Sequence, residues 1–132
     1  MLGIREPDKY GKESYAALTE KVRAYCDGRG VETVFYQSNH EGDLVDKIQE
    51  AYFEGADGIV INPGAYTHTS IALLDALLST RIPTVEVHIS KIEEREDFRQ
   101  ISYVRRAAVA TVTGRGTDGY IDACEILLGD KK

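Results

Sequence analysis

The sequence is poor in the features that characterise membrane, nucleic-acid-binding and secreted proteins. Its 132 residues contain no apolar run near the roughly 20 residues that span a bilayer, and the start lacks the apolar core of a signal peptide. Lysine and arginine total 16 against 22 aspartates and glutamates, so the net charge is -6 and no basic surface is expected. We therefore expect a cytoplasmic protein with neither a membrane nor a nucleic acid as its partner.

Cysteine is also scarce. Cys26 and Cys124 lie far apart in the sequence, in helix-like segments, and neither has metal-ligand spacing around it. We interpret both as reduced packing residues, so redox chemistry is not expected. A phosphate-binding GxxxxGK[ST] loop is missing as well, which leaves phosphoryl transfer without an anchor.

The hydrophobic pattern alternates between helix and strand. It predicts helices over 13–30, 43–55, 67–80 and 120–129, strands over 31–38, 58–62, 83–90 and 108–114, and a charged loop with a short helical turn over 91–106. Such alternation implies right-handed crossovers and a parallel sheet covered on both faces. We predict one α/β domain over 1–132, a doubly wound parallel sheet whose usual leading strand is missing, because Met1–Gly11 is charged and interrupted by glycine and proline.

The segment TVEVHIS, residues 84–90, combines a strand pattern with a polar face. Side chains alternate along a strand, so its valines and isoleucine would share one face and its polar residues the other. A buried carboxylate costs free energy unless it is paired. Glu86 can hold the ring of His88 and favour its protonated form, which suits a general acid. A satisfied structural histidine remains the alternative interpretation.

Polar residues also follow the other predicted strands, at the edge where open parallel sheets bind ligands. In NPGAYTHTS, Asn62 and His68 adjoin this edge. Thr67 or Thr69 can cap the helix that follows, and the N-terminus of that helix favours an anionic or oxygen-rich ligand. This edge is therefore the expected ligand site.

Two further motifs have simple structural explanations. GRGTDG, residues 114–119, matches the GxGxxG dinucleotide pattern, but that pattern belongs to the first strand–helix unit, with an acidic residue about 20 positions later. Only 13 residues follow Gly119, so a turn that opens a helix is favoured, and a nucleotide-binding module remains an alternative. In REPDKYG, Arg5 and Tyr10 flank Pro7, a pattern that is also typical of a surface turn.

Four stretches taken together, LGIREPDKYG, QSNHEGDLVDKIQEA, GIVINPGAYTHTSIALLDAL and VEVHIS, resemble the type II 3-dehydroquinate dehydratases of the shikimate pathway. The resemblance extends over nearly the whole chain, with the motifs in the family's order and spacing. It implies a flavodoxin-like fold, no metal or organic cofactor, and a homo-oligomer, a dodecamer built from trimers. The implied reaction removes water from 3-dehydroquinate through an enolate to give 3-dehydroshikimate.

The resemblance also implies roles for individual residues. Tyr10, activated by Arg5, would be the base that removes a proton beside the substrate ketone. A tyrosine of pKa about 10 needs a shift of roughly three units for this, and one cation at about 4 Å supplies an interaction of that order. His88, oriented by Glu86, would protonate the departing hydroxyl. Substrate contacts would fall to the backbone amides of Ile89 and Ser90, to Asn62, His68 and Arg99, and to Asp75 of a neighbouring subunit.

The chain departs from the family at its start. Members begin with an apolar strand that ends in a run like Asn-Gly-Pro-Asn, whereas here Met1 and Leu2 directly precede the Gly-x-Arg-Glu-Pro motif. In a flavodoxin-like order this strand lies inside the sheet, so its loss would leave two strands without a partner and expose apolar surface. The asparagine that helps to stabilise the enolate would be lost too. A truncated, non-catalytic or impaired assembly subunit of the same fold is therefore a second hypothesis.

Overall fold

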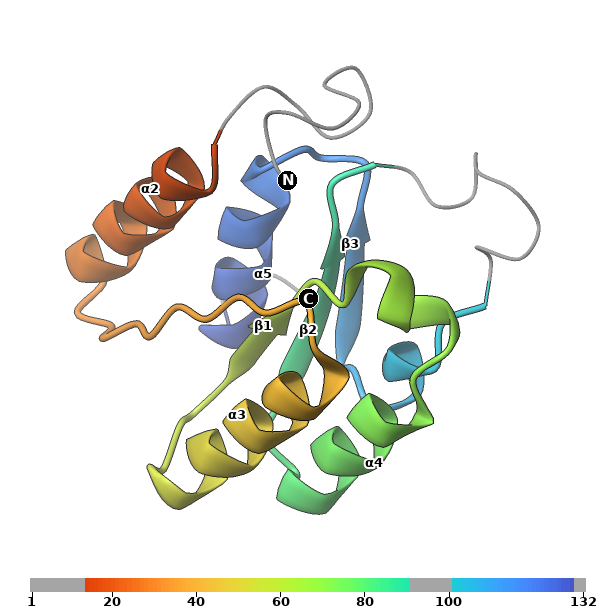
Figure 1. Cartoon of the computed structure of the whole chain (residues 1–132). Coiled ribbons are helices and arrows are strands. Elements are labelled where there is room, and N and C mark those ends of the chain that lie inside the picture. Colours follow the sequence, from red (N-terminus) through yellow and green to blue (C-terminus); the bar gives the residue numbers. More distant parts are fainter. Residues whose placement is uncertain (1–13, 91–100, 130–132) are drawn as a thin grey trace.

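Three parallel strands form the centre of the computed structural model, which describes residues 14–90 and 101–129 (Figure 1). The strands β1 (Ile59–Ile61), β2 (Thr84–His88) and β3 (Ala110–Thr113) lie side by side in chain order, and β2 pairs in parallel with both neighbours. Because parallel strands run in the same direction, neighbours cannot be joined by a tight turn and need a longer crossover connection. All three carboxyl ends therefore lie at one edge of the sheet.

Helices cover both faces of this sheet, as the alternating pattern predicts. The helices are α2 (Tyr15–Gly28), α3 (Glu41–Phe53), α4 (Ile71–Thr80) and α5 (Asp118–Leu127), with short 3₁₀ helices η1 (Gly64–His68) and η4 (Val104–Arg106). Figure 1 shows α3 and α4 together on one side of the strands and α5 on the other, with α2 beyond α5. The predicted doubly wound α/β architecture is confirmed, and η4 is a short helical turn within 91–106, the segment for which one was predicted.

Serine side chains set the starts of two helices. The hydroxyl of Ser14 accepts a hydrogen bond from the Ala17 amide at the start of α2, and that of Ser70 accepts one from the Leu73 amide at the start of α4. The prediction that Thr67 or Thr69 caps this second helix is wrong. Residues 64–68 first form η1, in which the Thr67 hydroxyl donates to the carbonyl of Gly64, so α4 begins later than expected.

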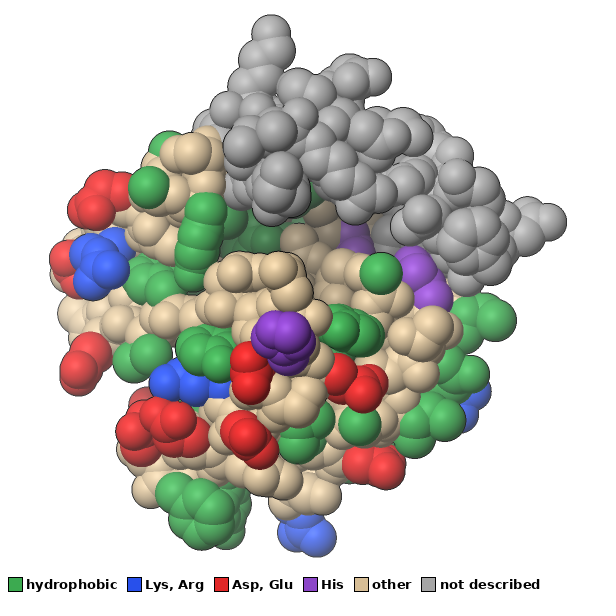
Figure 2. Space-filling model, viewed as in Figure 1, with side chains coloured by type: hydrophobic (Ala, Val, Ile, Leu, Met, Phe, Trp, Pro, Cys, Tyr) green, Lys and Arg blue, Asp and Glu red, His purple; other side chains and the backbone are tan. Residues whose placement is uncertain are grey.

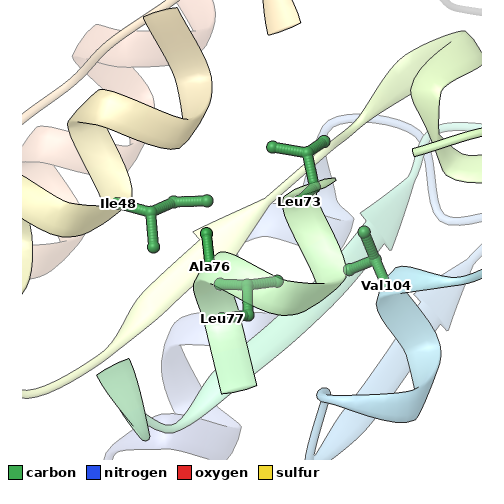
Figure 3. Packing of buried hydrophobic residues seen from close by; sticks show 5 residues of the cluster. All are labelled: Ile48, Leu73, Ala76, Leu77 and Val104. Carbon is green, nitrogen blue, oxygen red and sulfur yellow. The ribbon is translucent and has the colours of Figure 1, made fainter. Parts of the chain in front are cut away.

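One hydrophobic cluster fills the space between α3, α4 and η4. Figure 3 shows its buried side chains pointing toward one another from these three elements: Ile48, Leu73, Ala76, Leu77 and Val104. Ile59 and Ile61 of β1 pack against the cluster from the sheet. Complete burial of a large aliphatic side chain contributes about 1.5–3 kcal/mol, so this cluster holds α4 and η4 firmly over one face of the strands.

A second cluster joins the opposite face of the sheet to α5. Val85 and Val87 of β2 are fully buried against Ala123. Gly119, in the first turn of α5, lies so close to the sheet that a β-carbon there would be 3.2 Å from Cγ1 of Val87. The absence of a side chain at this position allows the close approach of the helix to β2.

Residues 31–38, predicted as a strand, form no strand in the structure. The segment still alternates, since Phe35 is partly buried while its neighbours Val34 and Tyr36 are 69% and 48% exposed. No described strand lies beside it to take up its backbone hydrogen bonds, and β1 is an edge strand within the described part of the chain. The prediction of a strand over 31–38 is therefore wrong, and the described residues form three strands where four were predicted.

Candidate active site

A buried acid–histidine pair lies at the carboxyl end of β2. Glu86 and His88 share one face of this strand, are 0% and 8% exposed, and lie 2.5 Å apart between Oε2 of the carboxylate and Nε2 of the ring. The polar face predicted for TVEVHIS is thus neither solvated nor turned outward. It must be satisfied by partners within the fold, since an unpaired buried charge is strongly unfavourable.

Three further side chains surround the Glu86 carboxylate. Ser102 donates its hydroxyl to Oε2 at 2.7 Å, while the Nε of Arg105 and the hydroxyl of Thr111 lie 3.4 and 3.3 Å from Oε1. Thr111 is the partner of Glu86 in the register of β2 and β3. Ser102 lies just before η4 and Arg105 lies within it, and the Ser102 hydroxyl also accepts the backbone N–H of Arg105. Both carboxylate oxygens are therefore hydrogen-bonded.

This surrounding network determines the charge of Glu86. Burial on its own would raise the pKa of the carboxyl, but the hydrogen bonds from His88 and Ser102, with the charges of His88 and Arg105, outweigh burial and lower the pKa. Because an ionised carboxylate only accepts hydrogen bonds, Nε2 of His88 must carry a proton in this pair. Proton exchange with a ligand then falls to Nδ1, which has no partner among residues 14–90 and 101–129.

The ring of a second histidine, His68, is held in place by a contact with the backbone of residues 101–103. Nδ1 of His68, in η1, lies 2.7 Å from the carbonyl oxygen of Ile101, an acceptor that requires a proton on this nitrogen. The amide of Tyr103 donates to the carbonyl of Thr67 at 3.0 Å, which ties the same two segments together a second time. Nε2 of His68 is the nitrogen left to contact a ligand.

The other predicted contacts that fall within the described residues occupy the same edge, except Asp75. Asn62 directly follows β1, and Ile89 and Ser90 directly follow β2. Asp75 is exposed on α4, two residues from Leu73 and Leu77, which face the core, so its side chain points away from the sheet. Within one chain, Asp75 is thus separate from the Glu86 network.

Three predicted site residues, Arg5, Tyr10 and Arg99, lie outside the described residues. Ser102, Arg105 and Thr111 were not predicted from the sequence. Only the proximity of Ser102 and Arg105 at helical spacing indicates that they could act together. Their contact with Glu86 depends on how η4 and β3 pack against β2, which a linear pattern does not specify.

Two backbone amides of the GRGTDG turn donate hydrogen bonds to the residues that follow β2. Gly116 donates to the carbonyl of Ile89 at 3.0 Å, and Gly114 donates to that of Ser90 at 3.2 Å. The carboxylate of Asp118, which a nucleotide phosphate would meet at the start of α5, pairs with Lys21 at 2.5 Å. These contacts support the interpretation of a structural turn that holds the end of β2, and they disfavour the nucleotide-binding alternative.

The described part of the chain offers neither a metal site nor a membrane span. No three or more histidine, cysteine, aspartate or glutamate residues gather there in an arrangement that could hold a metal ion. No helix among these residues has both the length and the apolar character that a bilayer span requires.

Comparison with known families identifies the class of protein that this fold and site define. The family model described as "Dehydroquinase class II" matches residues 1–128. The chain therefore belongs to the class II dehydroquinase family.

Individual relatives agree with this assignment. The chain is 53% identical over 120 residues to a 3-dehydroquinate dehydratase of Rhodopseudomonas palustris, covering 91% of this chain and 80% of the relative. It is 52% identical to the crystal structure of a type II dehydroquinase from Butyrivibrio crossotus, with a TM-score of 0.95 over 96% of this chain and 88% of that one. The corresponding structure from Propionibacterium acnes is 34% identical with a TM-score of 0.89 over the same shares. The predicted flavodoxin-like fold is thus confirmed.

Proposed function

We propose that the chain is a 3-dehydroquinate dehydratase, a hydro-lyase that eliminates water from 3-dehydroquinate to give 3-dehydroshikimate. The observation that supports this most directly is the buried Glu86–His88 pair, fixed at the ligand-binding edge of the sheet. Relatives of about 50% identity carry this enzyme's name. The product is an intermediate of the shikimate pathway, which leads to the aromatic amino acids.

The elimination proceeds through an enolate. A base, proposed to be Tyr10 activated by Arg5, removes the proton beside the substrate ketone, and the electron pair moves onto the ketone oxygen. The ring of His88, protonated on both nitrogens, then gives a proton to the departing hydroxyl. The enolate collapses to the conjugated enone and water leaves. The charged Glu86 fixes the orientation of this ring through its contact with Nε2, and each acid or base step is worth roughly 10²- to 10⁴-fold in rate.

Substrate binding is proposed for groups along the same edge. The backbone amides of Ile89 and Ser90 would take the carboxylate. The ring hydroxyls would be held by Asn62 and by Nε2 of His68, the nitrogen left over from the bond with Ile101. Arg99 is proposed as a further contact. No metal or organic cofactor enters this scheme.

Turnover tests the proposal directly. Purified wild-type protein mixed with 3-dehydroquinate should develop the absorbance of the conjugated enone. His88→Ala should lower kcat by at least about 100-fold, since it removes the acid, and Tyr10→Phe should abolish turnover while substrate still binds. Replacement of the exposed His40 by alanine is the matched control and should leave the rate unchanged. Full activity of His88→Ala would refute the assignment of the acid.

We also propose that the enzyme works as a homo-oligomer, a dodecamer built from trimers, in the cytoplasm. The outward position of Asp75 supports assembly, because this carboxylate can serve a site only in another subunit. Ile71 and Leu78, on the same outer part of α4, are 54% and 52% exposed. Figure 2 shows such hydrophobic side chains interspersed with acidic ones on the face that α3 and α4 form.

A second candidate function is an assembly subunit with impaired catalysis. The observation that favours it is the segment 31–38, which keeps a strand pattern although no strand of the described residues lies beside it. A folded, oligomeric protein that binds 3-dehydroquinate without turning it over would support this alternative over the enzyme.

A further inference from the structure

We propose that Tyr120 is a positioning residue that holds the side-chain amide of Asn62 in one orientation for substrate binding. Nδ2 of Asn62, at the end of β1, donates to the hydroxyl oxygen of Tyr120 at 2.9 Å. Tyr120 lies in the first turn of α5, 58 residues away. The inference rests on the proposed function, because the contact of Asn62 with substrate is part of that proposal.

The Asn62 amide is held at both ends. Its Oδ1 accepts the backbone N–H of Gly64 at 3.1 Å, while its Nδ2 donates to Tyr120. Rotating the amide by half a turn would place two donors, Nδ2 and the Gly64 N–H, against each other, so only one orientation satisfies both contacts. An amide offers two N–H donors and two acceptor lone pairs in all. One N–H and one lone pair therefore remain for a hydroxyl of the substrate.

Tyr120 is suited to this role because its ring is itself fixed. It packs against both the cluster that contains Leu18 and Val22 and the cluster that contains Val85 and Val87. Burial raises the pKa of Tyr120, although the hydrogen bond from Asn62 opposes this, so the hydroxyl stays neutral over the working pH range. Asn62, by contrast, is exposed and would otherwise rotate freely.

Loss of the hydroxyl should weaken binding without changing the chemistry. The Asn62 amide would keep Gly64 as its single anchor and would spend part of its time in orientations that cannot meet the substrate. This contact is made in the ground state and the transition state alike, so its loss raises KM and spares kcat. A role of Tyr120 in overall stability alone would not produce that division.

Steady-state kinetics with 3-dehydroquinate test the inference. Tyr120→Phe keeps the ring and removes only the hydroxyl, and we expect KM to rise about three- to tenfold, the loss typical of one hydrogen bond, with kcat nearly unchanged. Tyr25→Phe is the matched control, because Tyr25 packs against the same cluster as Tyr120 but its hydroxyl contacts Arg29 instead. This control should leave both constants unchanged.

A double variant identifies the residue through which Tyr120 acts. Asn62→Ala should raise KM by itself, and adding Tyr120→Phe to it should raise KM no further, since the group being positioned is already gone. If the two effects multiply, or if Tyr120→Phe lowers kcat and leaves KM unchanged, the inference is overturned.

A measurement without turnover separates this inference from the proposed function. Wild-type protein that leaves 3-dehydroquinate unchanged would refute the proposed activity. The side-chain ¹⁵N–¹H signals of Asn62, assigned by their absence in Asn62→Ala, would then decide the positioning role alone. A shift of these signals in Tyr120→Phe and not in Tyr25→Phe sustains it, whereas signals that stay in place overturn it.

Discussion

At the scale of single residues, Glu86 is the side chain on which the site depends most. It is completely buried and negatively charged, a combination that is stable only because four side chains supply hydrogen bonds. The Glu86–His88 contact follows from alternation along a strand and could be predicted from the sequence. The contributions of Ser102 and Thr111 could not be predicted, because they depend on the packing of η4 and on the register of β3.

The lowered pKa of Glu86 makes the stability of the fold depend on pH. Because the folded state holds this proton less tightly than the unfolded chain, its stabilising contribution is complete above the ordinary glutamate pKa of about 4.3 and is lost as the pH falls through the folded value. We expect the free energy of unfolding to decline more steeply below about pH 5 in the wild type than in Glu86→Gln, as measured by urea denaturation.

The same substitution should also lower stability at neutral pH. In Glu86→Gln one carboxylate oxygen becomes an NH2 group, which meets hydrogen-bond donors from which it cannot accept, and this costs about 1–3 kcal/mol. Glu20→Gln, at an exposed position on α2, is the control and should behave like the wild type. Parallel pH profiles for the wild type and Glu86→Gln would contradict the role given to this carboxylate.

At the scale of elements, the close approach of α5 to the sheet is the most sensitive contact. A β-carbon at Gly119 would meet Cγ1 of Val87 at 3.2 Å and Cγ1 of Val112 at 3.4 Å, both on stiff β-branched side chains. Gly119→Ala should therefore destabilise the fold by about 1–3 kcal/mol in urea denaturation, through overpacking.

Gly58 provides the matched comparison for this prediction. A β-carbon there would lie 3.1 Å from Cδ1 of Leu127, the far end of a flexible side chain that can move aside. Gly58→Ala should cost clearly less than Gly119→Ala. A larger loss of stability at Gly58 would mean that the contact of α5 with β2 is looser than the structure indicates.

The order of helices and strands was largely predictable, because hydrophobic periodicity reports which face of an element is buried. Two predictions failed for identifiable reasons. Residues 31–38 have the composition of a strand, but a strand exists only where a neighbour accepts its hydrogen bonds, and no described neighbour does. The cap of α4 is Ser70, whereas Thr67 or Thr69 was predicted, because a 3₁₀ turn precedes the helix. Such short turns leave little trace in hydrophobic periodicity.

At the scale of the whole molecule, the role proposed for Asp75 would link catalysis to assembly. If this carboxylate serves the site of a neighbouring subunit, then Asp75→Ala and His88→Ala are defective in different parts of a shared site. Mixing the two inactive variants under conditions that exchange subunits should restore part of the activity, because some sites would receive an intact His88 from one chain and an intact Asp75 from another.

The oligomer itself can be examined in the same preparations. Leu78→Asp places a charge on the exposed part of α4 and should shift the protein to smaller species in sedimentation or mass photometry. Ala17→Asp, at an exposed position in the first turn of α2, is the control and should leave the oligomer unchanged. Failure of the mixed variants to recover any activity, despite exchange, would place Asp75 outside the catalytic site.

The adjoining residues 101 and 102 carry a constraint on how this protein can vary. The carbonyl of Ile101 accepts a hydrogen bond from the ring of His68. The hydroxyl of Ser102 donates to the carboxylate of Glu86, which in turn orients the ring of His88. Because the first contact uses only the backbone, the Ile101 side chain, which is 57% exposed, is free to differ. Insertion or deletion of one residue here would disturb the contact of Ile101 with His68 or the contact of Ser102 with Glu86. Evolution and protein engineering can therefore change the chemistry of position 101 but not the length of the chain around it.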